Sequence, residues 1–175
     1  MTEDDLKIFI RGTEHFFEKS TSAPAKVSTP YVMESDDRVV YDFSAIIGVS
    51  GSQRGCVYYS APRDMVRELV EYLGETLTHD EIYADYVGEI ANTISGNARA
   101  SLGSGFMISV PVVFTAGTGE NKVRFPPDIP AFVVPLEWRG YQSSLIMALK
   151  ENEPTEDGID TQALEDDLVE TETLT

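Results

Sequence analysis

The sequence has few of the residues that build metal cages and disulfide frameworks. Its 175 residues include a single cysteine, Cys56, and two histidines, His15 and His79. One cysteine cannot form an internal disulfide, and these three residues are too few and too scattered for a zinc cage. We therefore expect neither a disulfide scaffold nor a structural zinc site.

Basic residues and long apolar runs are also scarce. Thirteen Lys and Arg stand against thirty Asp and Glu, which leaves a net charge of −17. A surface this negative repels phosphate backbones and anionic lipid headgroups, so we expect no nucleic-acid or membrane partner. No apolar run approaches the ~20 residues that span a bilayer. The first residues, MTEDDLKIF, do not resemble a secretion signal. We expect a cytoplasmic, acidic protein whose partner carries positive charge.

The acidic residues are concentrated at the C-terminus. Residues 151–175 contain ten Asp or Glu and no Lys or Arg, and without these ten charges the net charge is −7. This segment has no aromatic residue and few apolar ones, so it cannot bury enough surface to offset the entropy lost on ordering. We predict one domain over residues 1–150 and a disordered acidic tail over 151–175. Leu164, Leu168 and Val169 could line one side of a short helix, which leaves a docking role open.

Hydrophobic periodicity within residues 1–150 predicts a mixed fold. Two capping boxes, Thr2 with Asp5 and Thr78 with Glu81, predict helix starts. We expect one helix that begins at Thr2, a second over 62–73 and a third over 78–102. The expected strands cover 39–49, 55–60, 106–116, 131–138 and 141–149. This order predicts an α/β fold of the α+β sandwich type. A mainly antiparallel sheet would be covered by helices, the first of them amphipathic.

The helix predicted over 78–102 has two contrasting faces. At about 100° per residue, one narrow stripe collects polar residues and a glycine: Glu81, Asp85, Glu89, Asn92, Gly96 and Arg99. The opposite face is apolar and predicts the buried side: Tyr83, Ile90, Ala91, Ile94 and Ala98. Gly96 is unexpected in the exposed stripe, because glycine inside a helix costs about 1 kcal/mol relative to alanine. Either the stripe is an ordinary solvated face with an incidental glycine, or another backbone approaches the helix there.

The same helix carries a recognisable motif. The run DYVGEIANTISGNA over residues 85–98 resembles the signature of the CheC, CheX and FliY phosphatases of bacterial chemotaxis. That signature has an Asp or Ser, a Glu and an Asn at the spacing of Asp85, Glu89 and Asn92, and a proline further on. Pro111 follows Asn92 after eighteen residues, fewer than in the family pattern, and a shorter helix-to-strand loop would account for this. The element order and size resemble CheX proteins over most of residues 1–150.

The resemblance implies an enzyme that hydrolyses the aspartyl phosphate of a CheY-like receiver domain. Asn92 would orient the attacking water, and Glu89 would pair with a lysine of the receiver's active site. The chemistry is consistent, because an acyl phosphate is already reactive and its hydrolysis needs mainly a water held in line. A carboxamide can hold that water without titrating. A carboxylate three residues earlier lies on the same helix face.

The resemblance also implies how the partner is bound. Glu81, Asp85, Gly96 and Arg99 would contribute to the surface that binds the receiver. The protein would need no cofactor of its own, because the magnesium ion of such a reaction belongs to the receiver. A single Glu-x-x-Asn motif is the pattern of CheX, in which two chains pair through their sheets, and this implies a homodimer.

A second class of function stays open at this point. The chain could be a non-catalytic adaptor that binds a receiver domain or a flagellar-switch component through the same helix. The two hypotheses differ at Asn92, because a binding protein has no need of a carboxamide at that position. A phosphatase for a receiver outside chemotaxis is a milder variant of the first hypothesis.

Overall fold

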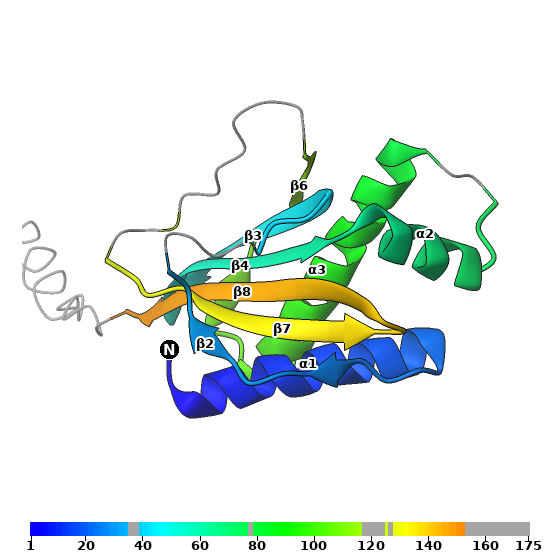
Figure 1. The fold of residues 1–175 in the computed structure, drawn as a ribbon. Helices are drawn as coiled ribbons and strands as arrows, with labels where there is room; N and C mark the ends of the chain where they lie inside the picture. The colour runs from blue at the N-terminus through cyan, green and yellow to red at the C-terminus, as the bar shows by residue number, and fades with distance from the viewer. Residues whose placement is uncertain (35–38, 77–78, 117–124, 126–127, 153–175) are drawn as a thin grey trace, which may run out of the picture.

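Three helices and eight strands make up the described part of the chain. The computed structural model describes residues 1–34, 39–76, 79–116, 125 and 128–152. The elements in chain order are α1 (Glu3–Thr21), β1 (Lys26–Val27), β2 (Tyr31–Val32), β3 (Phe43–Gly51), β4 (Gln53–Ala61), α2 (Arg63–Tyr72), α3 (Asp80–Leu102), β5 (Phe106–Ile108), β6 (Val112–Thr115), β7 (Phe132–Trp138) and β8 (Tyr141–Glu151) (Figure 1).

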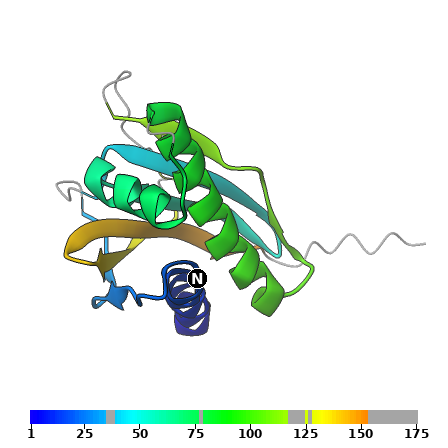
Figure 2. The same ribbon diagram turned by 90° about the vertical axis from the view of Figure 1, so that its right-hand side faces the viewer.

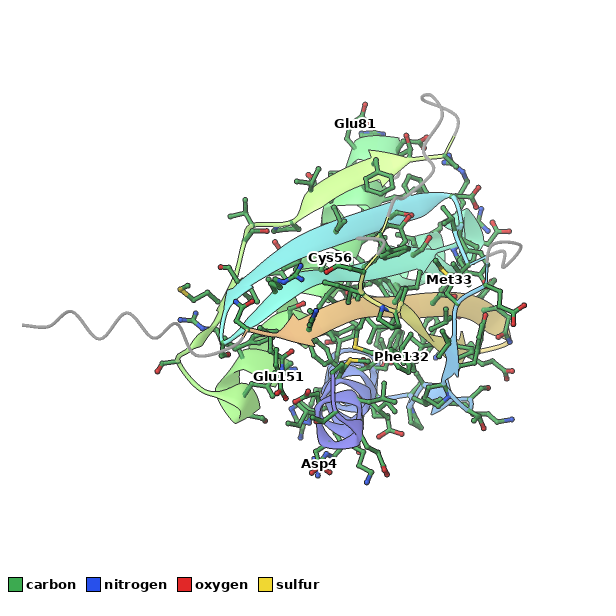
Figure 3. All side chains as sticks on the ribbon, turned by 90° about the vertical axis from the view of Figure 1, so that its left-hand side faces the viewer. Asp4, Met33, Cys56, Glu81, Phe132 and Glu151 are labelled. Carbon is green, nitrogen blue, oxygen red and sulfur yellow. The ribbon has the colours of Figure 1, made fainter. Side chains whose placement is uncertain are left out.

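The strands form one antiparallel sheet with the helices on one side. The strand order is β1-β7-β8-β4-β3-β5, with β2 also on β7 and β6 also on β3. The three helices lie on the same face of the sheet and share one core with it (Figure 2). The opposite face, seen in Figure 3, has a smaller cluster that includes Cys56, Tyr58 and Ile146. This architecture confirms the predicted α+β sandwich. Among the described residues, no helix combines the length and apolarity needed to cross a bilayer.

The predicted amphipathic helix at the N-terminus is confirmed as α1. The Thr2 hydroxyl accepts a hydrogen bond from the Asp5 backbone N–H at 3.1 Å, and the Asp5 carboxylate accepts one from the Thr2 N–H at 2.8 Å. The same carboxylate oxygen accepts a hydrogen bond from Gln53 Nε2 at 3.2 Å, so the capping box also joins α1 to β4. Phe9 and Phe17 are fully buried on the sheet-facing side. The sequence-encoded cap therefore fixes where the helix starts and where it docks.

The start of α3 differs from the prediction. Thr78 lies outside the described residues, and the helix begins at Asp80 with His79 as N-cap, whose side chain makes no capping hydrogen bond. A tertiary contact holds this end instead. Arg63 Nη1 donates to Asp80 Oδ1, and Arg63 Nη2 donates to Asp80 Oδ2 at 2.8 Å. This hydrogen-bonded pair lowers the pKa of the Asp80 carboxyl and ties the start of α3 to the start of α2.

The strand predicted over 106–116 is interrupted by a bulge. β5 and β6 both pair with β3, but two residues of β3 face the three residues 109–111. Pro111 lies in the bulge, where its missing N–H costs no ladder hydrogen bond. Ser109 fixes the bend, since its N–H donates to the Gly48 carbonyl and its hydroxyl accepts from the Gly48 N–H, both at 2.9 Å. Pro111 of the bulge lies against α3, with its Cγ 3.6 Å from a Cβ placed at Gly88.

Two further differences from the prediction concern the start of β3 and the short strands β1 and β2. The strand predicted over 39–49 begins at Phe43. The Tyr41 N–H donates to Ser60 Oγ at 2.7 Å, and the Asp42 carboxylate accepts from the Arg63 N–H at 2.8 Å, so these residues bond outside the ladder. The sequence pattern also missed β1 and β2. Each is two residues long and pairs with β7, and no periodicity can show in so short a strand.

α3 comes close to β6 at one glycine. A Cβ at Gly88 would lie 2.8 Å from Val113 Cγ1 and 3.6 Å from Pro111 Cγ. A Cβ at Gly96, two turns further along, would have no neighbour within 4 Å. Gly88 is therefore required by the internal packing of the domain, whereas Gly96 is not.

The two glycines form a matched pair for a stability test. We expect Gly88→Ala to lower the free energy of unfolding by about 1–3 kcal/mol, because the new methyl group overlaps a β-branched side chain with little freedom to rotate. Gly96→Ala should raise it by up to about 1 kcal/mol, since alanine is the better helix former and the space is open. Urea unfolding followed by circular dichroism measures both. Equal effects of the two substitutions would contradict the close approach at Gly88.

Candidate functional site

α3 has the two faces that the sequence predicts. The five residues expected on the apolar side are all buried: Tyr83, Ile90, Ala91, Ile94 and Ala98. On the other side, Gly96 is half-buried and the other five stripe residues are exposed: Glu81, Asp85, Glu89, Asn92 and Arg99. The prediction of one buried and one solvent-facing side is confirmed. The functional roles assigned to the stripe residues are not tested by this placement.

Glu89 and Asn92 are the chemical centre of this stripe. They are three residues apart on one helix face, a spacing that brings Cβ atoms to about 5–6 Å of each other. In the described part of the chain, neither side chain has a hydrogen-bond or ion-pair partner, although Asp80 at the start of the same helix is paired with Arg63. A free carboxylate beside a free carboxamide can engage a cation and a water molecule brought by another protein.

The bulge between β5 and β6 lies beside this centre. Pro111 and Val113 pack on Gly88, the residue that precedes Glu89. Val110 and Val112 point into solvent, with 79% and 60% of their surface exposed. The edge of the sheet next to α3 therefore carries two exposed valines, of which Val112 lies on the face away from α3, because the adjacent Val113 packs on Gly88. Sequence reasoning missed this edge, because the run at 110–113 predicts a strand without showing which side chains stay uncovered.

At the Glu81 end, the stripe meets the same strand. A shallow pocket of about 330 Å³ lies between α3 and β6. Its lining comes from these two elements: Asp80, Glu81, Ala84, Val113, Phe114 and Thr115. The edge of β6 thus follows α3 over about two turns, from Asp80 to Gly88. A partner that lies on the stripe would contact both elements.

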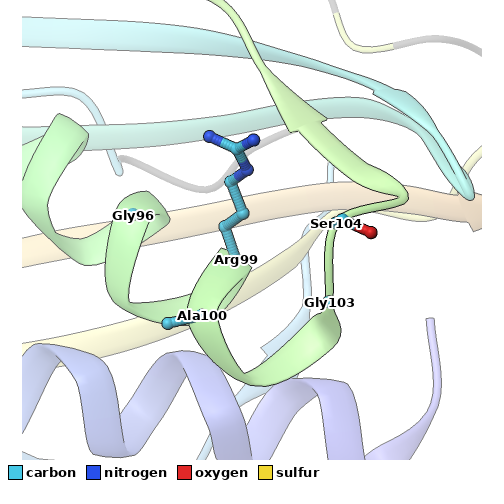
Figure 4. Close-up of a pocket in the computed structure, with 5 residues that line it drawn as sticks. All are labelled: Gly96, Arg99, Ala100, Gly103 and Ser104. Carbon is cyan, nitrogen blue, oxygen red and sulfur yellow. The ribbon is translucent and has the colours of Figure 1, made fainter.

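The other end of the stripe has a different charge. Gly96 and Arg99 line a hollow of about 370 Å³ together with Ala100, Gly103 and Ser104 (Figure 4). The Arg99 side chain extends away from the helix, and within the described residues its guanidinium has no ion-pair partner. The four acidic residues of α3 all precede Asn92, so the helix presents a negative first part and a positive last turn.

The remaining residues singled out in the sequence lie away from this centre. His15 and His79 are exposed, and Cys56 is buried in the sheet, where burial raises the pKa of its thiol to about 11. Asn97 is half-buried where α3 meets Gly12 of α1. Across the described residues, no three His, Cys, Asp or Glu side chains are grouped so that they could hold a metal ion.

Comparison with known proteins gives the chain a family. The family model described as "Chemotaxis phosphatase CheX" matches residues 43–137, which include α3 and the bulge. No curated protein sequence matches the chain.

Several solved structures have a similar fold. The chemotaxis protein CheX of Vibrio vulnificus is 21% identical, with 84% of this chain and 99% of that chain covered and a TM-score of 0.73. CheX of Desulfovibrio desulfuricans is also 21% identical, with 85% and 99% covered and a TM-score of 0.71. A CheX–CheY–BeF3–Mg2+ complex of Borrelia burgdorferi matches at 18% identity, with 83% and 97% covered and a TM-score of 0.67.

At these identities the structural likeness shows the fold alone, and the family assignment depends on the sequence model. That model covers more than half of the chain, including Glu89 and Asn92 on the exposed face of α3. The chain belongs to the CheX family of chemotaxis phosphatases.

Proposed function

We propose that this protein hydrolyses the aspartyl phosphate of a CheY-like receiver domain. The observation that carries the proposal is the pair of free side chains, Glu89 and Asn92, on one exposed face of α3. Membership of the CheX family supports a phosphatase. The Borrelia burgdorferi CheX that was solved together with CheY supports a partner of the CheY type.

In the proposed reaction, Asn92 positions the attacking water. Its amide oxygen accepts a hydrogen bond from the water, and its NH2 group can donate to a phosphoryl oxygen. The water oxygen bonds to phosphorus as the bond between phosphorus and the aspartyl oxygen breaks, which yields inorganic phosphate and the free receiver carboxylate. The chain supplies orientation rather than a nucleophile, and orientation is the main requirement for a bond that is already reactive.

In this proposal, Glu89 fixes the position of the receiver on α3. Its carboxylate pairs with the active-site lysine of the receiver, one helical turn from the water held by Asn92. The magnesium ion belongs to the receiver, so no cofactor is assigned to this chain. Glu81 and Asp85 extend the negative potential along α3 and speed the encounter with a cationic group.

The bulge and the glycine complete the proposed docking surface. Val110 is exposed in the bulge, next to the Pro111 that packs on Gly88, and would be covered by the receiver. Gly96 leaves open space on the helix, so another backbone can approach there. Pairing of two chains into a homodimer stays a prediction.

Replacing Asn92 tests catalysis directly. We expect Asn92→Ala to slow the loss of phosphate from a phosphorylated receiver by roughly 100-fold or more, because the water is no longer held in line. Binding of the receiver should change little. The measurement is release of radiolabelled phosphate, with binding followed separately by fluorescence anisotropy.

Asn97→Ala is the matched control, since this carboxamide is on the same helix but beside Gly12 rather than in the stripe. It should retain full hydrolysis. If wild-type protein accelerates phosphate loss from no receiver yet still binds one, the adaptor hypothesis replaces this proposal.

Replacing Glu89 tests the proposed ion pair. We expect Glu89→Gln to raise the KM for the phosphorylated receiver by roughly 30-fold or more, because the receiver lysine is left buried without its partner. Glu71→Gln removes an exposed carboxylate from α2 and should leave KM unchanged. An unchanged KM in the Glu89→Gln variant would show that Glu89 does not contact the receiver.

A further inference from the structure

A groove between α1 and α3 lies outside the proposed catalytic centre. Figure 2 shows the two helices on the same face of the sheet. The groove has a volume of about 570 Å³, and both helices contribute to its lining: Ile8, Arg11, Gly12, His15, Asn97, Ala100 and Ser101. Ala100 also lines the hollow of about 370 Å³ beside Gly96 and Arg99. The two depressions therefore both border Ala100, on the last turns of α3.

Small residues and unpaired cations characterise the two depressions. The Cβ position of Gly12 is 3.4 Å from Asn97 Cβ, so the helices approach closely there, and Ala100 keeps the next turn open. Ile8 of α1 and Ala100 of α3 are the apolar side chains of the lining, and we refer to these two as the apolar base. Arg11 lines the groove, and Arg99 lies on the other side of α3, at the hollow. Both are exposed, and neither has an ion-pair partner among the described residues. Such a surface suits an acidic segment with a few apolar side chains.

The chain itself supplies a segment of this kind, and the segment starts nearby. The Asn152 N–H donates to the Ser52 carbonyl at 3.0 Å, and the Ser52 N–H donates to the Gly105 carbonyl at 2.8 Å. Gly105 follows two residues after Gly103, which lines the hollow beside Arg99. The described chain therefore ends next to the last turn of α3.

The length and the charge of the C-terminal segment both favour it as the occupant of the groove. Residues 153–175 number twenty-three, with nine Asp or Glu and no Lys or Arg. An extended segment of that length spans about 75 Å, roughly twice the ~35 Å length of α3. Glu81, Asp85 and Glu89 repel it from the first part of the helix, whereas Arg11 and Arg99 attract it to the last part.

We propose that the acidic C-terminal segment, residues 153–175, docks into the groove between α1 and α3. Its carboxylates pair with Arg11 and Arg99, and its apolar residues Leu164, Leu168 and Val169 cover the apolar base. The docked segment occupies the surface next to Gly96 without covering Asn92. Competition with the receiver for that end of α3 is a regulatory consequence that rests on the proposed function, whereas the docking does not.

The docking can be measured on the full chain with a spin label on the segment. Thr171→Cys supplies the labelling site, because the native Cys56 is buried and its thiol, with a pKa raised to about 11, is protonated at neutral pH. We expect paramagnetic broadening of the backbone amide signals of Gly12, Ala100 and Gly103 in the nitrogen-15 spectrum. Raising the salt concentration should weaken the broadening through screening.

Charge reversal of the two arginines tests the assigned contacts. The double variant Arg11→Glu with Arg99→Glu should reduce the ratio of docked to free segment by about 2- to 30-fold, the range for two exposed ion pairs. Lys26→Glu reverses an exposed cation on β1 and should leave the broadening unchanged. Both arginines are exposed, so dispersed spectra of the variant confirm that it is folded.

Three results would overturn the proposal. The first is undiminished broadening in the double variant, and the second is broadening confined to another surface. The third is broadening seen only when spin-labelled chains are mixed with separate isotope-labelled chains, because the segment would then dock on a second copy. Because no receiver is present, failure of the docking is distinct from failure of the proposed phosphatase activity.

Discussion

The packing of α3 on the sheet is the contact on which the rest of the structure depends. The helix buries Val87, Ile90 and Ile94 completely, and each such side chain contributes about 1.5–3 kcal/mol to stability. The close approach to β6 at Gly88 sets how deep the helix lies, and Pro111 of the bulge also packs there. This packing fixes the rotation of α3 about its axis. The side that carries Glu89 and Asn92 must then face water.

Ion pairs are distributed unevenly around the site. Arg63 pairs with Asp80 at the start of α3, Arg139 pairs with Glu68 on α2, and Arg54 on β4 pairs with Asp128, so among the described residues these ion pairs leave the middle of α3 unpaired. Glu89 has no cation near it in the described chain. A lone surface carboxylate costs nothing while it is hydrated, and it gains a strong hydrogen bond when a partner brings a cation into a drier interface. The arrangement suits a surface that functions in a complex.

Much of the fold could be predicted from local patterns. The capping box of Thr2 and Asp5 marks the start of α1, and hydrophobic periodicity locates α2, α3 and the longer strands within a few residues. Features produced by distant contacts could not be predicted. β1 and β2 are too short to show a period, the start of α3 depends on Arg63, and the bulge at Pro111 appears only when β5 and β6 are aligned with β3.

The sequence alone determined which residues share a face of α3, because a period of 3.6 residues places Glu89 and Asn92 on one side and Ile90 and Ile94 on the other whatever surrounds the helix. Its motif also indicated the family. Only the tertiary structure decided what surrounds the helix: the bulge with the exposed Val110, the close approach at Gly88, and the groove shared with α1. The physical reason is that helical periodicity is a local property of the backbone. Neighbours across the sheet are set by the packing of segments far apart in the chain.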